Sequence, residues 1–579
     1  MKIKLFDLFS LLTMLLVTAG CDQGWTPTAT AIVSGPNPTI TPASLVTQIP
    51  STTPTEIRLT PSTTPSTKPG NFSREQLIED ARQLADDIES AHPDPYIRRG
   101  GKIAFHRRLQ RLLNAIPESG LRRDEFIRLL RPFIAAVGDS HTEIWSDYEV
   151  NERSPGGVPL RFGIVEQLLY VTSVPNDLDH SLIGAILISV EGVPLAELCR
   201  RQEQLVALEN QYHVLEELAS RTLWYKPYLQ DLLPEWKNTD EIRVELQLPG
   251  GEVREMIFAL PQNMNALFTP ESQFALPTTD DSGFLYDFLD ADGKTAYLQV
   301  TNMTNYREAE EMAGKPARRL RSVTETFRSM VINMEQAGSD VLIIDLRGNQ
   351  GGNSVMGDIL IYFLYGKETL QNIMTYAEAN GGGMIRKYSN LFWEQTQSWT
   401  SLEQVNRGRT LPLEADDYDF NADFYGDEAR FLEQRAETIA YLENTWLART
   451  PTFWEEYQSE VYSGYYSPGN VLVLTDPWTF SSGFTLARYL YLAGATFIGT
   501  PSSQAANSFG NGQLWHLEHT GIEGTVSTTY SVMFPVDSKL AQVLPVDYPL
   551  TYEKLSEYDF DPNAEYQYAL ELLPELKGK

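Results

Sequence analysis

Cysteine is almost absent from this chain of 579 residues, in which only Cys21 and Cys199 occur. If Cys21 is acylated, as argued below, no intrachain disulfide can form. Cys199 lies in PLAELCRRQ, a stretch typical of a packed helix. We therefore expect neither a disulfide framework nor a cysteine nucleophile.

Positive charge is also scarce, since 46 basic residues stand against 77 acidic ones, for a formal net charge of −31. Such a surface repels phosphate backbones, so nucleic acid is not an expected partner. Only seven histidines occur, and no pair of them has the spacing of metal ligands. We therefore expect no metal and no other cofactor.

Long apolar runs are missing beyond the N-terminus, so no later segment is expected to cross a bilayer. At the N-terminus, two lysines precede LFSLLTMLLVTAG, an apolar run of signal-peptide length that ends directly before Cys21. The pattern resembles a bacterial lipoprotein signal. We expect residues 1–20 to be that signal, Cys21 to be lipidated, and the mature protein to be extracytoplasmic and anchored to the cell membrane. An ordinary secretory signal cut nearby is the alternative.

The first half of the remaining chain divides into four segments. Thr, Pro and Ser dominate residues 21–70, which predicts an extended, disordered linker. Helical periodicity over 71–137 predicts an N-terminal helical domain. Residues 138–205 hold a Ser-His motif and the short strands of a PDZ-like β module, and 206–285 form a connecting segment with helical and β pieces.

The second half, residues 286–575, alternates strands and helices. This alternation implies crossover connections and a largely buried sheet. Residues 366–465, rich in Trp, Tyr and Glu, interrupt it as a predicted helical insertion. The expected fold class is α/β within an α+β multi-domain chain.

A serine pair stands where a predicted buried strand passes into a helix, in VLVLTDPWTFSSGFTLARYL, residues 471–490. Ser481 and Ser482 would meet the positive end of that helix and its free backbone N–H groups. Those groups can stabilise an oxyanion when a serine attacks a carbonyl. A helix cap is the simpler reading of the pair taken alone.

Two further stretches suit this chemistry. In VLIIDLRGNQGGNS, residues 341–354, a buried strand leads into a loop with three glycines. It is no phosphate loop, because the lysine of such loops is missing. In the segment Gly-Asp-Ser-His-Thr, Ser140 and His141 stand at a domain junction, where a histidine can act as a general base at neutral pH.

Together these stretches resemble peptidase family S41, the tail-specific or C-terminal processing proteases, over most of residues 71–575. DLRGNQGG and TFSS match the family's two core signatures. The resemblance implies an α/β core of the ClpP/crotonase type and hydrolysis of polypeptide substrates, with C-terminal tails as a candidate class. It also implies that Ser481 is the nucleophile and that the N–H groups of Ser482 and Gly351 form the oxyanion hole.

The family divides according to its general base. One branch uses a lysine, but no lysine lies between Ser481 and Lys539, and Asn511 stands where it would be. The branch that resembles the tricorn protease core uses a Ser-His pair, which Ser140 and His141 match. The resemblance therefore implies that His141 takes the proton of the nucleophile.

The tricorn-like branch also places a glutamate behind the serine to orient the histidine. Asp537, in FPVDSKL, is the nearest acid in the corresponding C-terminal region and is our candidate. Glu523 and Asp547 are weaker candidates, and Asp139 is adjacent in sequence to the Ser-His pair.

Two rival functions remain. A catalytically weak or inactive member of the fold would bind peptides or lipophilic ligands in the cleft, but Ser481 and His141 are both present. An esterase is disfavoured because no Gly-x-Ser-x-Gly elbow surrounds Ser481.

Overall fold

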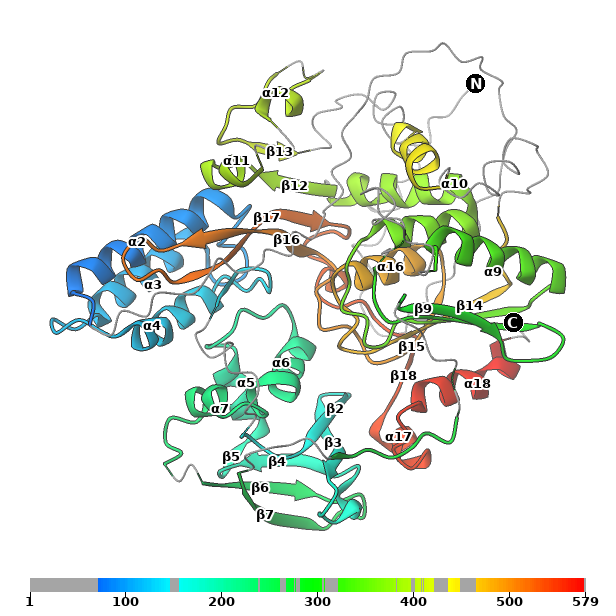
Figure 1. Ribbon diagram of the computed structural model, residues 1–579, viewed down its shortest axis with the longest axis horizontal. Coiled ribbons are helices and arrows are strands. Elements are labelled where there is room, and N and C mark those ends of the chain that lie inside the picture. Colours follow the sequence, from blue (N-terminus) through cyan, green and yellow to red (C-terminus); the bar gives the residue numbers. More distant parts are fainter. Residues whose placement is uncertain are drawn as a thin grey trace, which may run out of the picture. The chain divides into compact units, whose positions relative to one another are not determined.

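The computed structural model describes most of residues 71–576 (Figure 1). The expected signal peptide, the lipidated Cys21 and the linker lie outside the described residues. Also outside are the ranges 146–155, 238–239, 261–266, 275, 277–281, 305–306, 308–320, 382, 397–400, 408, 410, 421–435 and 448–464.

A six-stranded sheet forms the core of the C-terminal half, in the order β18-β15-β14-β11-β10-β9. All neighbours pair in parallel except the edge strand β9, so the chain needs the crossovers that the sequence predicted. The α/β fold class is thereby confirmed. The strands are β9 (Phe284–Phe288), β10 (Thr295–Val300), β11 (Val341–Asp345), β14 (Asn470–Thr475), β15 (Thr496–Gly499) and β18 (Tyr548–Pro549).

Helices cover both faces of this sheet. Alternate residues of β11 point to opposite faces, so Leu342 packs with helices α9 (Val323–Ala337), α10 (Val355–Gly381) and α16 (Ser481–Leu492). Ile343 packs on the other face with α18 (Ala564–Leu576), which follows α17 (Tyr552–Glu557). The apolar run of β11 is buried throughout because both faces are covered.

A second sheet carries the N-terminal helices α2 (Arg74–Ala91), α3 (Gly101–Ala115) and α4 (Arg123–Ala135). These helices share one core with Trp515 and Val526 of this sheet, and Figure 1 shows them beside β16 and β17. They are therefore not an independent domain, although the sequence suggested one. The strands are β1 (Glu143–Ile144), β12 (Gly383–Lys387), β13 (Tyr418–Phe420), β16 (Ser508–His516) and β17 (Glu523–Val532).

The predicted insertion 366–465 is not purely helical. Its strands β12 and β13 extend the second sheet by pairing with β17 and with each other. A non-helical residue, Gly366, divides α10 where the insertion begins. The described helices that follow are α11 (Asn390–Thr396), α12 (Leu402–Val405) and η4 (Leu442–Trp446).

A third, seven-stranded sheet forms the module that was expected to be PDZ-like. It includes β6 and β7, which the sequence had placed in a connecting segment, so the predicted boundary at residue 205 is wrong. The strands are β2 (Arg161–Val165), β3 (Leu168–Pro175), β4 (Ile186–Val190), β5 (Val193–Pro194), β6 (Glu241–Gln247), β7 (Val253–Ala259) and β8 (Leu267–Phe268). Between its strands lie α5 (Leu195–Gln202), α6 (Gln211–Glu217), η3 (Leu218–Thr222) and α7 (Lys226–Leu232).

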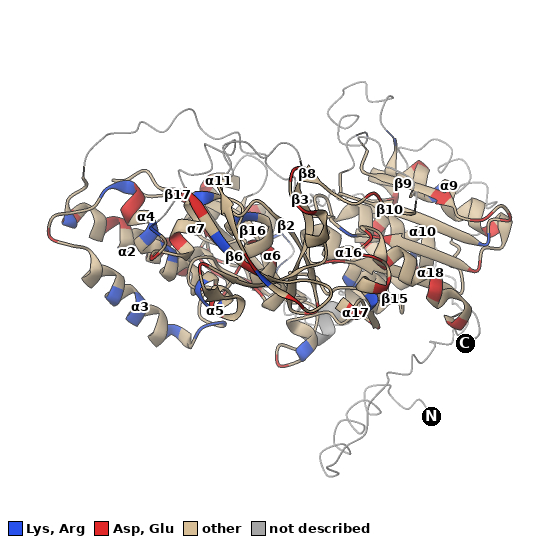
Figure 2. Cartoon of the chain, turned by 90° about the horizontal axis from the view of Figure 1, so that it is seen from below, with Lys and Arg blue, Asp and Glu red and all other residues tan. Residues whose placement is uncertain are grey.

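Charge is unevenly distributed despite the acidic total. Figure 2 shows basic side chains gathered along α3, where four lysine or arginine residues fall in fifteen positions. Among the described residues, no helix is both long and apolar enough to cross a membrane.

Candidate active site

The serine pair lies at a sharp turn between β14 and α16. Phe480 is the N-cap of the helix, and Ser481 follows with φ +50°, in the left-handed region that non-glycine residues seldom occupy. Surrounding contacts must offset the cost of this conformation. One of them is the hydrogen bond that the N–H of Ser481 donates to Oε1 of Gln504. This bond holds the backbone of Ser481 at the first turn of the helix.

The glycine loop after β11 lies directly against this turn. Gly351 has φ +103°, and a Cβ on it would be 2.6 Å from Cβ of Ser481 and 2.8 Å from N of Ser482. The Ser482 hydroxyl donates to the carbonyl oxygen of Gly352 at 2.7 Å, and the N–H of Phe480 donates to the carbonyl oxygen of Asn349 at 2.8 Å. The structure thus brings together Ser481, Ser482 and Gly351, as the sequence predicted.

The two expected oxyanion donors differ in their hydrogen bonding. The N–H of Gly351 donates to Oδ1 of Asn349 at 2.9 Å, so it is directed at a side chain. The N–H of Ser482 finds no acceptor in the part of the chain that is described. Of the two expected oxyanion donors, Ser482 is therefore the one whose N–H is without an acceptor among the described residues, and Gly351 would first have to give up its hydrogen bond to Asn349.

The expected base lies beside the residue that precedes the nucleophile. The imidazole of His141 and the ring of Phe480 are nearly parallel, with centroids 5.9 Å apart. The backbone of His141 is fixed by Oδ1 of Asp139, which accepts its N–H at 3.0 Å, and by the Thr525 hydroxyl, which donates to its carbonyl oxygen at 2.9 Å. No hydrogen bond joins His141 to Ser481 among the described residues, a separation that substrate-free sites often show.

A buried glutamate that sequence reasoning missed stands behind the Ser-His pair. The Ser140 hydroxyl donates to Glu209 and lies 3.4 Å from Nδ1 of His141. The second carboxylate oxygen of Glu209 accepts the N–H of Ala505 at 2.8 Å. Burial raises the pKa of Glu209, while the nearby His141 opposes that rise. Glu209 therefore has the position and the contacts expected of the orienting acid.

No local signal in the sequence indicates this role. Glu209 is 69 residues from Ser140 and directly precedes Asn210, whose side chain caps α6 by accepting the N–H of Tyr212 at 2.9 Å. A cap motif predicts only a helix start. The pairing with Ser140 exists only once the third sheet and the helices beside it have folded.

A second carboxylate, Asp139, also faces the base. Its oxygens lie 3.9 Å from Nδ1 of His141 and 3.3 Å from Nε2 of His92, and the His92 side chain is fully buried. Burial alone would raise the pKa of Asp139, but the close contact with His92 holds it well below its usual range. His92 accepts the N–H of Asp94 at Nδ1, 3.1 Å away, and its buried Nε2 has Asp139 as a close neighbour without a well-formed hydrogen bond.

The acids predicted from the C-terminal region do not reach the base. Asp537 is exposed in the turn after β17, and no contact joins it to His141 in the described structure. Glu523 faces His516 at 3.3 Å, and Asp547 accepts the N–H of Phe497 at 2.8 Å. The structure thus places Glu209 where Asp537 was expected.

Asn511 and Cys199 have the inert roles that the sequence suggested. The amide of Asn511 donates to the Thr529 hydroxyl at 3.0 Å. Cys199 is partly buried in α5, where burial raises the pKa of its thiol to about 11. A thiol with that pKa is a poor nucleophile at neutral pH.

Two groups of side chains have the spacing of metal ligands. In one, atoms of Asp139, His141 and Glu209 lie within 4.8 Å of one another; the other consists of His213, Glu216 and Glu217. The carboxylates of the first group already accept protein hydrogen bonds. In the second, Nδ1 of His213 accepts a backbone N–H at 3.4 Å and Glu217 faces Arg221 at 4.0 Å. Neither group requires a cation to hold it together.

Residues 294–517 match the profile of peptidase family S41. This segment, 224 of the 579 residues, is similar to that family. The segment contains the glycine loop and Ser481. It does not contain His141 and Glu209, which both precede its first residue. No curated protein sequence matches the chain.

Two solved structures of mature CPAF share its fold at low sequence identity. Mature CPAF is similar to this chain with a TM-score of 0.50 and 12% identity, over 87% of this chain and 98% of that one. Mature CPAF complexed with lactacystin has a TM-score of 0.51 and 12% identity, over 87% of this chain and 99% of that one. The photosystem II D1 C-terminal processing protease has a TM-score of 0.37 and 13% identity, over 84% of this chain and 95% of that one. The predicted resemblance to family S41 is confirmed over residues 294–517, and the choice of the family's histidine branch stays a prediction.

Proposed function

We propose that this chain is an S41-type serine endopeptidase that uses Ser481 as nucleophile and His141 as general base, outside the cytoplasm. The observation that supports this most strongly is the convergence of three parts. Ser481 stands at the strained start of α16, the glycine loop touches it, and the imidazole of His141 lies against Phe480, its neighbour in the chain.

In the proposed reaction, the oxygen of Ser481 attacks the peptide carbonyl carbon while His141 accepts the hydroxyl proton. The N–H of Ser482 and one N–H of the glycine loop stabilise the negative oxygen that results. The C–N bond then breaks, and His141 returns the proton to the leaving amine. In the second half of the reaction, water attacks the acyl carbon while His141 accepts a proton from it. The bond to the Ser481 oxygen then breaks, and His141 returns the proton to that oxygen.

The two buried carboxylates suit this cycle. As His141 becomes positively charged, Asp139 and the pair of Ser140 and Glu209 face its Nδ1 side. An anion on that side stabilises the imidazolium and fixes the tautomer whose Nε2 is free to act as the base. Glu209 therefore acts through Ser140 as a positioning residue.

The decisive experiment is labelling with a fluorophosphonate, followed by mapping of the modified peptide. We expect one adduct, on Ser481, absent from the Ser481→Ala variant and retained by Ser482→Ala, which keeps the backbone N–H. Ser481→Ala and His141→Ala should each abolish cleavage of an unstructured polypeptide such as casein. Turnover retained by either purified variant would remove that residue from the mechanism, and a wild-type chain that binds casein without cleaving it would support the non-catalytic alternative.

The proposed location has its own test. We expect Cys21 to become acylated after removal of residues 1–20, so the chain expressed in a bacterium should incorporate labelled palmitate and fractionate with membranes. Cys21→Ala should lose both properties and keep peptidase activity. Palmitate incorporation that persists in Cys21→Ala would contradict the anchor and leave the peptidase assignment untouched.

A further inference from the structure

Residues 97–117, which lead into α3 and contain it, form a locally basic stretch in an acidic chain. They hold six lysine or arginine residues and no acidic residue, whereas the chain as a whole has a formal net charge of −31. The six basic residues are Arg98, Arg99, Lys102, Arg107, Arg108 and Arg111. Their positive charge is available to a partner only where the fold itself does not neutralise it.

Acidic side chains of the neighbouring elements neutralise only part of this charge. Glu89 of α2 lies 3.7 Å from Nζ of Lys102, and Glu203, directly after α5, lies 3.5 Å from the guanidinium of Arg99. Both pairs are at the surface, where an ion pair contributes little. The three arginines of α3 itself form no ion pair in the part of the chain that the structure describes.

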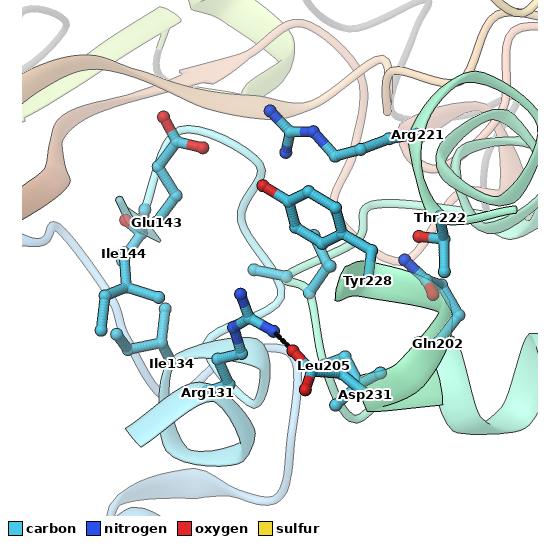
Figure 3. A pocket seen from close by; sticks show the side chains of 13 residues that line it. Arg131, Ile134, Glu143, Ile144, Gln202, Leu205, Arg221, Thr222, Tyr228 and Asp231 are labelled. Atoms are coloured by element: carbon cyan, nitrogen blue, oxygen red, sulfur yellow. Dashed lines mark hydrogen bonds and ion pairs between the residues drawn. The ribbon is translucent and has the colours of Figure 1, made fainter. Parts of the chain in front are cut away.

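The neighbouring helix α4 provides a contrast, because its arginines do have an acidic partner. Arg131 and Arg128 share the carboxylate of Asp231 on α7, which lies 2.9 Å from Nε of Arg128. Figure 3 marks the contact of Arg131 with Asp231. The positive charge of these two residues is therefore balanced within the fold, whereas that of the α3 arginines is not.

The arginines of α3 also repel one another. Arg107 and Arg111 are four positions apart, a spacing at which like charges destabilise a helix. Burial, together with the charges of Arg111 and Arg99, lowers the pKa of Arg108. An anionic surface placed against these side chains would relieve the repulsion, so the arrangement favours a negatively charged partner.

An apolar side chain is exposed on the same side of the helix. Ile103 of α3 is 70% exposed, and Ile97, shortly before the helix, is 46% exposed. Positions 103, 107 and 111 are each four apart, so Ile103 lies in line with the two arginines. A helix that presents basic residues together with an apolar one is typical of helices that lie in the headgroup region of a membrane.

We propose that the α3 face, formed by the exposed side chains of Arg99, Lys102, Ile103, Arg107 and Arg111, docks on a bilayer that contains anionic lipids. Nucleic acid and acidic polypeptides share the negative charge, but they offer no apolar layer for Ile103. The acidic remainder of the chain does not prevent docking, because charges farther apart than about 8–10 Å are largely screened at physiological salt.

Docking would give the chain a fixed orientation on the membrane. It depends neither on the proposed peptidase reaction nor on the proposed lipid at Cys21, which would only raise the local concentration of the α3 face at the bilayer. The two contributions can therefore be measured separately.

The test is sedimentation with vesicles of phosphatidylglycerol or of phosphatidylcholine. The chain used is residues 21–579 with Cys21→Ala, so that neither the expected signal segment nor an anchor contributes. We expect binding to phosphatidylglycerol vesicles that weakens as salt is raised, and no binding to phosphatidylcholine. The double variant Arg107→Gln/Arg111→Gln should lower the partition coefficient at least about tenfold. Glutamine forms helices about as well as arginine, so this variant should fold.

A matched control removes the same charge elsewhere. Arg243→Gln/Arg254→Gln changes two basic residues of β6 and β7 and should bind as the parent chain does. Ile103→Gln tests the apolar contact and should weaken vesicle binding several-fold.

Loss of binding in Arg107→Gln/Arg111→Gln, with binding kept in the control, would support the proposal. Equal binding to both lipids, no binding to phosphatidylglycerol, or equal losses in the two double variants would overturn it. Binding to poly-glutamate or duplex DNA that exceeds vesicle binding would assign the α3 face to a soluble polyanion and would also overturn it. None of these outcomes bears on peptidase activity or on lipidation of Cys21.

Discussion

The nucleophile side and the base side of the candidate site are built in different ways. On the nucleophile side, two short segments supply everything: the glycine loop after β11 and the turn before α16, both inside the matched range 294–517. On the base side, four residues from three distant places meet around His141: His92, Asp139 with Ser140, and Glu209.

The difference lies in what each chemical role requires. An oxyanion hole needs backbone N–H groups in an unusual conformation, and this requirement leaves glycines and an exposed elbow in the sequence. A base needs only a nearby carboxylate, which a folded chain can provide from many positions. The nucleophile side is therefore constrained locally, and the base side only in three dimensions.

The largest effect is expected on the nucleophile side, from Gly351→Ala. The added Cβ would lie 2.6 Å from Cβ of Ser481, at a φ of +103° that alanine adopts only under strain. We expect kcat/KM to fall by about 10²–10³-fold, the usual cost of losing an oxyanion donor. Gly348→Ala is the matched control, because Gly348 also has a positive φ but its Cβ would meet nothing within 4 Å. Equal losses in the two variants would show that backbone strain, and not contact with Ser481, is responsible.

A smaller effect is expected on the base side, from Glu209→Gln. The variant keeps the shape of the side chain but removes the anion behind Ser140, and we expect kcat to fall about 10–10²-fold with KM little changed. The acid limb of the pH profile of kcat/KM should move to lower pH, because the imidazolium loses a nearby negative charge. Asp537→Asn is the control and should leave both quantities unchanged. A loss in Asp537→Asn with none in Glu209→Gln would restore the acid predicted from the sequence.

The same substitution has a consequence for stability whose sign follows from the pKa. Burial holds the pKa of Glu209 above its ordinary 4.5, so the folded state binds this proton more tightly than the unfolded chain does. Glu209 therefore contributes most to the free energy of unfolding below pH 4.5, its ordinary pKa. This contribution is lost as the pH rises through the pKa of the folded state. Glu209→Gln should remove this slope in urea titrations made between pH 4 and pH 8. An unchanged slope would show that Glu209 is not the group that titrates.

Features built from one local segment could be predicted from the sequence, and features built from distant segments could not. The alternation of strand and helix predicted a buried sheet with crossover connections, because each parallel strand requires its crossover, but it did not predict the number of strands. The glycine loop and the serine elbow could be found because the backbone conformation of an oxyanion hole requires glycines and a turn within short segments. The pairing of β12 with β17 and of β4 with β6 was missed, since short strands separated by tens of residues leave no periodicity that identifies their partners. Glu209 was missed for the same reason.

A further test of the base side is His92→Phe, expected to have a moderate effect. Nε2 of His92 lies 3.3 Å from Asp139, in a fully buried position, and the ring packs beside that of Phe509, 4.4 Å away, a packing that phenylalanine keeps. Without this imidazole, the pKa of Asp139 should rise, and the carboxylate that faces His141 should lose negative charge at low pH. We expect a several-fold loss of kcat that is greatest at the acid end of the profile. A loss that is uniform with pH, together with a lower melting temperature, would indicate a purely structural role.

The smallest effect is expected from Asn511→Gly, which separates the two branches of the family on this chain. Asn511 occupies the position at which a lysine base would stand, and its amide contacts only the Thr529 hydroxyl among the side chains described. Its φ of +55° is one that glycine adopts without strain, so the substitution removes the side chain and little else. If His141 is the base, kcat/KM should change less than about threefold, within the range of a single lost hydrogen bond. A loss comparable with that of Glu209→Gln would mean that residues of β16 take part in proton transfer, and the contrast between a local nucleophile side and a dispersed base side would no longer hold.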